Sequence, residues 1–101
     1  MRRTLPIKIP ETELRNFCRK NHIRKLALFG SVLRNDFRED SDIDVLVEFE
    51  AGHVPGLGFI RIQRELAALF SRKVDLNTPK FLSRHFREQV LQEAEVLYAQ
   101  E

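Results

Sequence analysis

Apolar residues recur with the three-to-four-residue spacing of an amphipathic helix in three stretches of the chain. The stretches run from about 10 to 21, from about 57 to 70 and from about 81 to 98. Their apolar stripes consist of Leu14, Phe17 and Cys18, then Phe59, Ile62, Leu66, Leu69 and Phe70, and last Phe86, Val90, Ala94 and Leu97. The pattern predicts three helices, and we expect the second to cover a sheet.

Three shorter stretches have the pattern of β-strands. Residues 25–29 form an apolar run that ends at Gly30, which is typical of a buried strand. Residues 42–50 alternate with period two, and residues 73–77 alternate again, with Val74 and Leu76 inward and Asp75 on the opposite face. Because strands and helices alternate along the chain, we expect an α/β (α+β) fold with a small mixed sheet of three or more strands flanked by helices.

The strand predicted over residues 42–50 has two different faces. One face carries Ile43, Val45, Val47 and Phe49, and the other carries Asp42, Asp44, Leu46, Glu48 and Glu50. Aspartates two positions apart on a strand project from the same face, with attachment points about 6 to 7 Å apart. Two close carboxylates repel each other unless a cation lies between them, and Mg²⁺ prefers such oxygen ligands. The alternative is an edge strand whose acidic face is simply solvated.

Two further features favour a metal site over a solvated face. Asp75, on the next predicted strand, supplies a carboxylate that could face Asp42 and Asp44. Three acids from two neighbouring strands suit a two-metal site, in which the ions lie about 3.5 to 4 Å apart. The pair Gly30 and Ser31 follows the first strand, where backbone N–H groups and a hydroxyl could hold a triphosphate, although such pairs usually mark ordinary turns.

Length and composition limit the classes of protein. A chain of 101 residues fits one domain, so we expect a single domain over residues 1–101. The net charge of +2 is mild and the basic residues are scattered, which disfavours a nucleic-acid-binding module. The sequence contains no apolar run long enough for a membrane span or signal peptide, and its single cysteine, Cys18, excludes an internal disulfide. We therefore expect a cytoplasmic protein with Cys18 buried.

The three histidines are His22, His53 and His85. They lie far apart in the sequence and lack the short spacing of a typical zinc motif. Surface or capping roles are therefore expected for them in preference to zinc binding.

The motifs together resemble those of the polymerase beta-type nucleotidyltransferase superfamily. The resemblance rests on Leu-Phe-Gly-Ser at 28–31, Ser-Asp-Ile-Asp-Val-Leu-Val at 41–47 and Lys-Val-Asp-Leu at 73–76. Within the superfamily the chain is similar to the minimal nucleotidyltransferase (MNT) group, which includes MntA-like antitoxins, through Arg34, Asp36 and a closing helix with the pattern Glu-Ala-Glu-x-x-Tyr at 93–98. The likeness spans nearly the whole chain, with all three acidic positions retained.

The resemblance implies a Mg²⁺-dependent enzyme that moves the nucleoside monophosphate of an NTP onto a hydroxyl. It implies that Asp42 and Asp44 hold two Mg²⁺ ions, and that Asp75 completes the catalytic metal site and accepts or orients the proton of the attacking hydroxyl. Gly30 and Ser31 would contact the nucleotide phosphates. Arg34 could neutralise triphosphate charge, although an arginine after a turn is more often a solvated surface residue.

The resemblance also implies a partner. MNT proteins commonly act as antitoxins beside a HEPN ribonuclease toxin, and some transfer AMP from ATP to a tyrosine of that toxin. Transfer to a small-molecule hydroxyl is an alternative, as is a noncatalytic antitoxin that only covers the toxin. A chain this short has little surface for a substrate pocket of its own, which favours an acceptor held by another chain in a homo- or hetero-oligomer. The acceptor, the base preference, the number of AMP units and the oligomeric state are open at this point.

Overall fold

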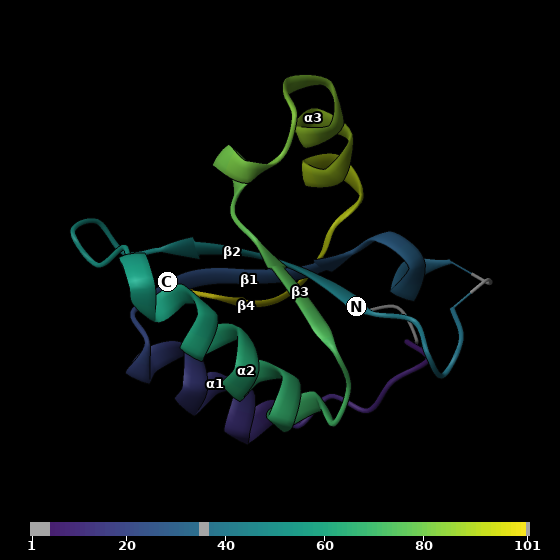
Figure 1. Cartoon of the computed structure of the whole chain (residues 1–101), viewed down its shortest axis with the longest axis horizontal. Coiled ribbons are helices and arrows are strands. Elements are labelled where there is room, and N and C mark those ends of the chain that lie inside the picture. The colour runs from purple at the N-terminus through teal and green to yellow at the C-terminus, as the bar shows by residue number, and fades with distance from the viewer. Residues whose placement is uncertain (1–4, 35–36, 101) are drawn as a thin grey trace.

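The computed structural model describes residues 5–34 and 37–100, and Asp36 of the motif above lies outside these ranges. Its elements lie in the order α1 (Glu11–Lys20), β1 (Ile23–Phe29), β2 (Ile43–Phe49), α2 (Phe59–Phe70), β3 (Val74–Asn77), α3 (Arg84–Glu93) and β4 (Glu95–Ala99) (Figure 1). Short 3₁₀ turns cover Gly30–Leu33, Gly56–Gly58 and Pro79–Phe81. Within the described residues, no helix is long and apolar enough to cross a membrane.

The four strands form one mixed sheet in the order β3-β2-β1-β4. Strand β1 pairs antiparallel with β2 and with β4, whereas β2 and β3 pair in parallel. The expected α/β fold with a small mixed sheet is thus confirmed. Because β2 lies between two other strands, the alternative in which the two aspartates sit on a solvated edge strand is wrong.

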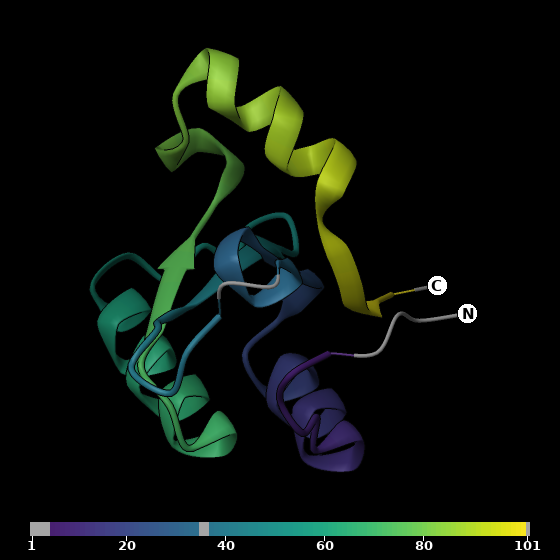
Figure 2. The ribbon, with the colours of Figure 1, turned by 90° about the vertical axis from the view of Figure 1, so that its right-hand side faces the viewer.

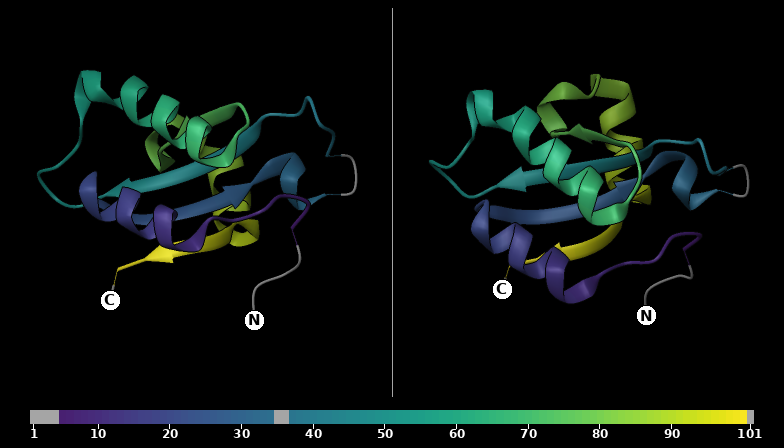
Figure 3. Two further views of the ribbon diagram at one scale, coloured as in Figure 1. Left: turned by 90° about the horizontal axis from the view of Figure 1, so that it is seen from below. Right: turned by 60° about the horizontal axis from the view of Figure 1, so that its bottom comes forward.

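Helices α1 and α2 lie side by side on one face of the sheet (Figures 1 and 3). Their apolar stripes pack against the inward residues of the strands, as the periodicity predicted. The fully buried strand side chains beneath them are Ile23, Leu26, Leu28, Ile43, Val45 and Val47. This layer is the main hydrophobic core, and it leaves the opposite face of β2 to carry the aspartates.

A second, smaller cluster covers part of the opposite face. It consists of Phe29, Leu46, Leu82 and Val90, with Ala94 packed against it. Leu82, Val90 and Ala94 come from the segment that runs from the end of β3 through α3 to the residue after it. This segment rises on the side of the sheet away from α1 and α2 (Figures 1 and 2). Leu46 is therefore buried although the alternation places it on the same face as Asp44.

The third predicted helix is partly wrong, because it ends at Glu93 instead of continuing to Tyr98. Residues Glu95–Ala99 form strand β4, which pairs with β1. Val90 packs in the small cluster, whereas Leu97 packs in the main core on the other side of the sheet. One straight helix could not place both side chains in this way, and β4 also pairs a side of β1 that would otherwise be an exposed sheet edge.

Cys18 is the free thiol of the chain, and it is fully buried in the main core. Burial raises the pKa of its thiol to about 12, so the reactive thiolate is scarce at neutral pH. We expect an aromatic disulfide reagent to modify Cys18 roughly a hundredfold more slowly in the native protein than in denaturant. Absorbance of the released thiol measures both rates, and equal rates would contradict this burial.

Candidate active site

Asp44 and Asp75 are cross-strand neighbours. In the parallel pairing of β2 with β3, Asp44 is in register with Asp75 and Ile43 with Val74. Ile43 and Val74 belong to the main core, so the alternation places both aspartates on the face opposite α1 and α2. Asp44 is half-buried and Asp75 is exposed. The sequence predicted this common face, and the structure brings the two residues together on it.

Asp42 lies just before β2, in a segment that hydrogen bonds fix against the rest of the sheet. The backbone N–H of Ile43 donates to the carbonyl of Lys73 at 2.9 Å, which ties this end of β2 to the residue that precedes β3. On the other side of Asp42, the backbone N–H of Arg38 donates to the Ser41 hydroxyl at 3.0 Å. Asp42 itself is exposed. The hydrogen bonds on either side of Asp42 hold its backbone at the end of the sheet where the parallel pairing of β2 with β3 begins.

The edge strand β3 is also anchored through its outer side. The backbone N–H of Leu76 donates to the side-chain oxygen of Gln63 in α2 at 2.9 Å. Asn77 donates from its side chain to the backbone carbonyl of Asp75 at 3.1 Å. A strand of only four residues thereby holds Asp75 at a defined position.

The Asp75 and Asp42 carboxylates act electrostatically on Asp44. The pKa of Asp44 is raised, first by burial, then by the Asp75 carboxylate and then by that of Asp42, while the Arg34 guanidinium opposes the shift. Nearby like charges disfavour the ionised form of a carboxyl group, so negative charge is concentrated here. The arrangement favours a bound cation, because a cation relieves both the burial and the repulsion.

Gly30 forms the wall of the site beside Asp44. It follows β1 with a φ of +75°, and a Cβ at this position would lie 2.2 Å from the Asp44 carboxylate oxygen Oδ2. Real side chains do not tolerate such an approach, so only glycine fits here. Phe29, the residue before it, is in register with Asp44 on β2. The glycine-serine turn and the aspartates are thus direct neighbours, which sequence order alone could not establish.

Arg34 lies close enough to the site to lower the pKa of Asp44. Its own side chain is exposed. Together with Gly30 it lines a pocket of about 800 Å³ whose other wall is α3, including Phe86 and Gln89. This pocket lies beside Gly30, the first residue of the glycine-serine turn.

Glu48 in β2 and Glu50 directly after it do not join the three aspartates. Glu48 forms an ion pair with Arg24 of β1, and Glu50 accepts a hydrogen bond from Gln100. Glu50 instead lies beside His22 and His53. Among the residues that the structure describes, these three side chains form a group of potential metal ligands, with one ligand atom from each within 4.8 Å of the others. The sequence reasoning missed this group because its members are separated by up to 31 positions (53 − 22).

Comparison with known proteins places this site in a family. Residues 12–101 match the family model described as Polymerase beta, Nucleotidyltransferase. Protein adenylyltransferase MntA of Thermococcus cleftensis is 39% identical to the chain over 72 residues, which cover 70% of this chain and 71% of the relative. The match includes far more of the chain than the short motifs.

Solved structures share the fold. The crystal structure of a toxin-antitoxin with AMP-PNP has a TM-score of 0.73 at 23% identity and covers 92% of this chain and 76% of the solved one. The solved structure of a tri-AMPylated Shewanella oneidensis HEPN toxin in complex with MNT antitoxin also matches, with a TM-score of 0.64 at 23% identity. This match covers 89% of this chain and 70% of the solved one. Taken with the three aspartates beside the glycine-serine turn, the family match means that the chain belongs to the polymerase beta nucleotidyltransferase family, as an MntA-like minimal nucleotidyltransferase.

Proposed function

We propose that this nucleotidyltransferase is an antitoxin that transfers AMP from ATP to a tyrosine hydroxyl of a HEPN toxin, with Asp42, Asp44 and Asp75 as its Mg²⁺ ligands. The observation that carries the proposal is the half-buried Asp44 carboxylate, in register with Asp75 and beside Gly30. The names of the similar proteins support the reaction, since they include a protein adenylyltransferase, a complex with AMP-PNP and an AMPylated HEPN toxin.

The residues present fit Mg²⁺. Carboxylate oxygens are hard donors, which Mg²⁺ prefers over nitrogen and sulfur, and it usually needs only one or two protein carboxylates together with substrate phosphates. Burial and the neighbouring carboxylates raise the pKa of Asp44, and a bound cation would relieve both effects. When bound, Mg²⁺ neutralises phosphate charge and stabilises the attacking and leaving oxygens of an in-line displacement.

The donor nucleotide would lie over the turn that follows β1. In this proposal the backbone N–H groups of Gly30 and Ser31 and the Ser31 hydroxyl would donate to phosphate oxygens, and Gly30 has no side chain that would stand in the way. Arg34 adds positive charge at the same wall of the pocket. The rest of the ATP molecule would extend toward α3.

The reaction itself requires positioning and one proton transfer. The tyrosine oxygen attacks the α-phosphorus of ATP, a bond forms between them, and the bond from the α-phosphorus to the bridging oxygen breaks, so that pyrophosphate leaves. Asp75 is the exposed member of the register pair, and it can accept or orient the proton of an incoming hydroxyl. Asp44, which is less accessible, would hold the donor side in place.

An acceptor on another chain agrees with the exposed apolar surface. Val54, Leu57, Ile60 and Phe81 expose 59 to 98% of their surface and border one pocket of about 590 Å³. Apolar patches of this kind mark surfaces that bind proteins. We propose that the toxin docks here, which would leave the pocket beside Gly30 free for ATP.

The proposal is tested by mixing the chain with the HEPN toxin, labelled ATP and Mg²⁺. We expect label on a toxin tyrosine and recovery of the complex, with labelling lost on chelation of Mg²⁺. Asp42→Ala should abolish labelling but retain binding, whereas Asp40→Ala serves as a matched control, because Asp40 is exposed and is not among the charges acting on Asp44. A complex that neutralises the toxin without any labelling would support the alternative of a steric antitoxin.

A further inference from the structure

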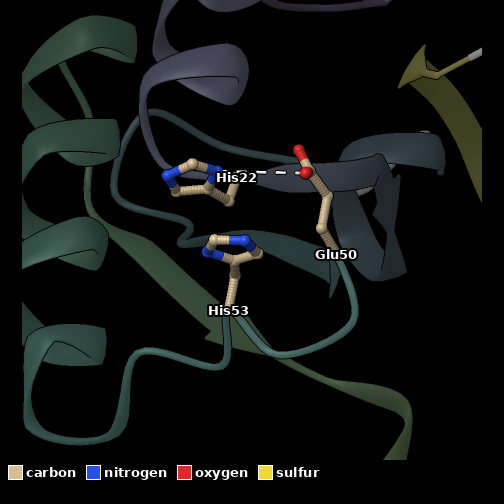
Figure 4. Close-up of side chains that lie close together, drawn as sticks. All are labelled: His22, Glu50 and His53. Atoms are coloured by element: carbon tan, nitrogen blue, oxygen red, sulfur yellow. Dashed lines mark ion pairs between the residues drawn. The ribbon is translucent and has the colours of Figure 1, made fainter.

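His22, Glu50 and His53 form a compact group on the opposite end of β2 from Asp42 (Figure 4). The three residues come from different segments: His22 lies between α1 and β1, Glu50 directly after β2, and His53 in the loop that leads to α2. One potential ligand atom from each side chain lies within 4.8 Å of the other two. Imidazole and carboxylate are both ordinary ligands of divalent transition metals.

The backbone holds the three residues together independently of their side chains. The N–H of Glu50 donates to the carbonyl of His22 at 2.8 Å, and the N–H of His53 donates to the carbonyl of Glu50 at 3.0 Å. These bonds tie both His22 and His53 to Glu50. The grouping is therefore built into the chain path and does not depend on a chance meeting of long side chains.

The Glu50 carboxylate is oriented by a second contact. Its Oε1 lies 3.9 Å from Nδ1 of His22, while its Oε2 accepts a hydrogen bond from the Gln100 side chain at 2.6 Å. Such a partner fixes the direction of a ligating carboxylate, as outer-shell residues do in metal sites. One oxygen is thereby held by Gln100 and the other faces the histidines.

The two imidazole rings are accessible from solvent. They stack with centroids 3.9 Å apart and planes inclined by 14°. Half of the His22 side-chain surface is exposed, and His53 is exposed as well. An ion could therefore enter from water and keep water molecules at its remaining coordination positions.

We propose that His22, Glu50 and His53 bind one divalent transition-metal ion of the Zn²⁺ type, at a site separate from the three aspartates. Tetrahedral Zn²⁺ with bonds of about 2.0 to 2.1 Å places its ligand atoms about 3.3 Å apart, so each atom needs to move inward by about 1 Å or less. The rings would open from their stack to turn one nitrogen each toward the ion. Three protein ligands and water make a complete set for this metal.

The ion would add a side-chain cross-link beside the place where Ile23 of β1 pairs with Phe49 of β2. It would tie the α1–β1 junction to the loop over residues 51–58, which carries Val54 and Leu57 of the exposed apolar patch. Ligands that bind only the folded state raise its stability by mass action. Metal binding should therefore stabilise the protein and order this loop.

The test is a titration of the untagged full chain with Co²⁺ and Zn²⁺ in excess Mg²⁺, which occupies the aspartates and competes weakly for imidazole nitrogen. We expect one equivalent of Co²⁺ to give visible absorption bands that Zn²⁺ displaces. Calorimetry should give one Zn²⁺ per chain, and Zn²⁺ should raise the melting temperature.

Three variants assign the ligands and one serves as the control. His22→Asn suits the positive φ of 56° at this position, and Glu50→Gln and His53→Ala change partly or fully exposed side chains, so all three should fold. Each should weaken Zn²⁺ binding by about tenfold or more, and Gln100→Ala by roughly tenfold. His85→Ala in α3 should bind like the parent. Parent-like binding by all three ligand variants, or no binding by the parent, would overturn the proposal.

Discussion

Asp44→Asn is expected to lower the rate of nucleotidyl transfer by about a thousandfold or more while the protein stays folded. Loss of one group that stabilises the transition state typically costs about a hundred- to a thousandfold, and Asp44 would also hold the metal. The measurement is the rate of label transfer from ATP to the toxin under saturating Mg²⁺. Its circular dichroism spectrum should match that of the parent.

The same variant should raise the melting temperature of the metal-free protein by a few degrees at neutral pH. Because the pKa of Asp44 is raised in the folded state, ionising this carboxyl group is less favourable in the folded than in the unfolded chain. The resulting loss of stability is present above the folded-state pKa and disappears as the pH falls through it. Asparagine removes the charge, so the stability difference between variant and parent should shrink on acidification.

Asp40→Asn is the matched control for both measurements, because Asp40 is exposed in the loop before β2. It should transfer AMP at the parent rate and melt at the parent temperature. Transfer by the Asp44 variant at the parent rate would exclude Asp44 as a metal ligand. An Asp44 variant that melts below the parent at neutral pH would contradict the raised pKa.

Gly30→Ala is expected to have the second-largest effect. Its Cβ would meet the Asp44 oxygen Oδ2 at 2.2 Å and Cγ at 3.1 Å, so the carboxylate must move. A displacement of about 1 Å can slow a reaction roughly 100-fold, and we expect a loss of at least this size. The positive φ adds about 1 to 2 kcal/mol of destabilisation, since L side chains disfavour the left-handed region.

Gly52→Ala separates the two causes. Gly52 has a φ of +80°, yet a Cβ there has no neighbour within 4 Å. It should lose stability through backbone strain but retain the parent rate of transfer. The free energy of unfolding from denaturant titration and the transfer rate distinguish the two variants. Equal activity of Gly30→Ala and the parent would mean that the contact with Asp44 does not position the carboxylate for the reaction.

Local sequence pattern predicted most of the helices and strands. The stripe Leu14, Phe17 and Cys18 marks the buried face of α1, and the alternation around Asp44 marks the two faces of β2. Both signals come from residues a few positions apart, where the geometry of a helix or a strand fixes which side chains share a face. For the same reason the sequence placed Asp42 and Asp44 on one side before any fold was known.

The C-terminal segment shows where local pattern fails. Val90 and Leu97 have helical spacing, but they pack on opposite faces of the sheet. The strand Glu95–Ala99 is selected by pairing with β1, whose partner residues lie 67 to 74 positions earlier (95 − 28 and 99 − 25). Strand formation there depends on a distant partner, and the tertiary pairing overrides the local preference.

What the sequence by itself determined is the residue types and the face on which each local group lies. These groups are the pair Asp42 and Asp44 at the start of β2, the lone Asp75 and the glycine-serine turn. Only the tertiary structure decided that β2 and β3 pair with Asp44 opposite Asp75, that Gly30 touches Asp44, and that His22 meets His53. The physical reason is range. Side-chain direction follows from a few neighbouring dihedral angles, whereas contacts between distant segments depend on how the whole chain buries its apolar surface.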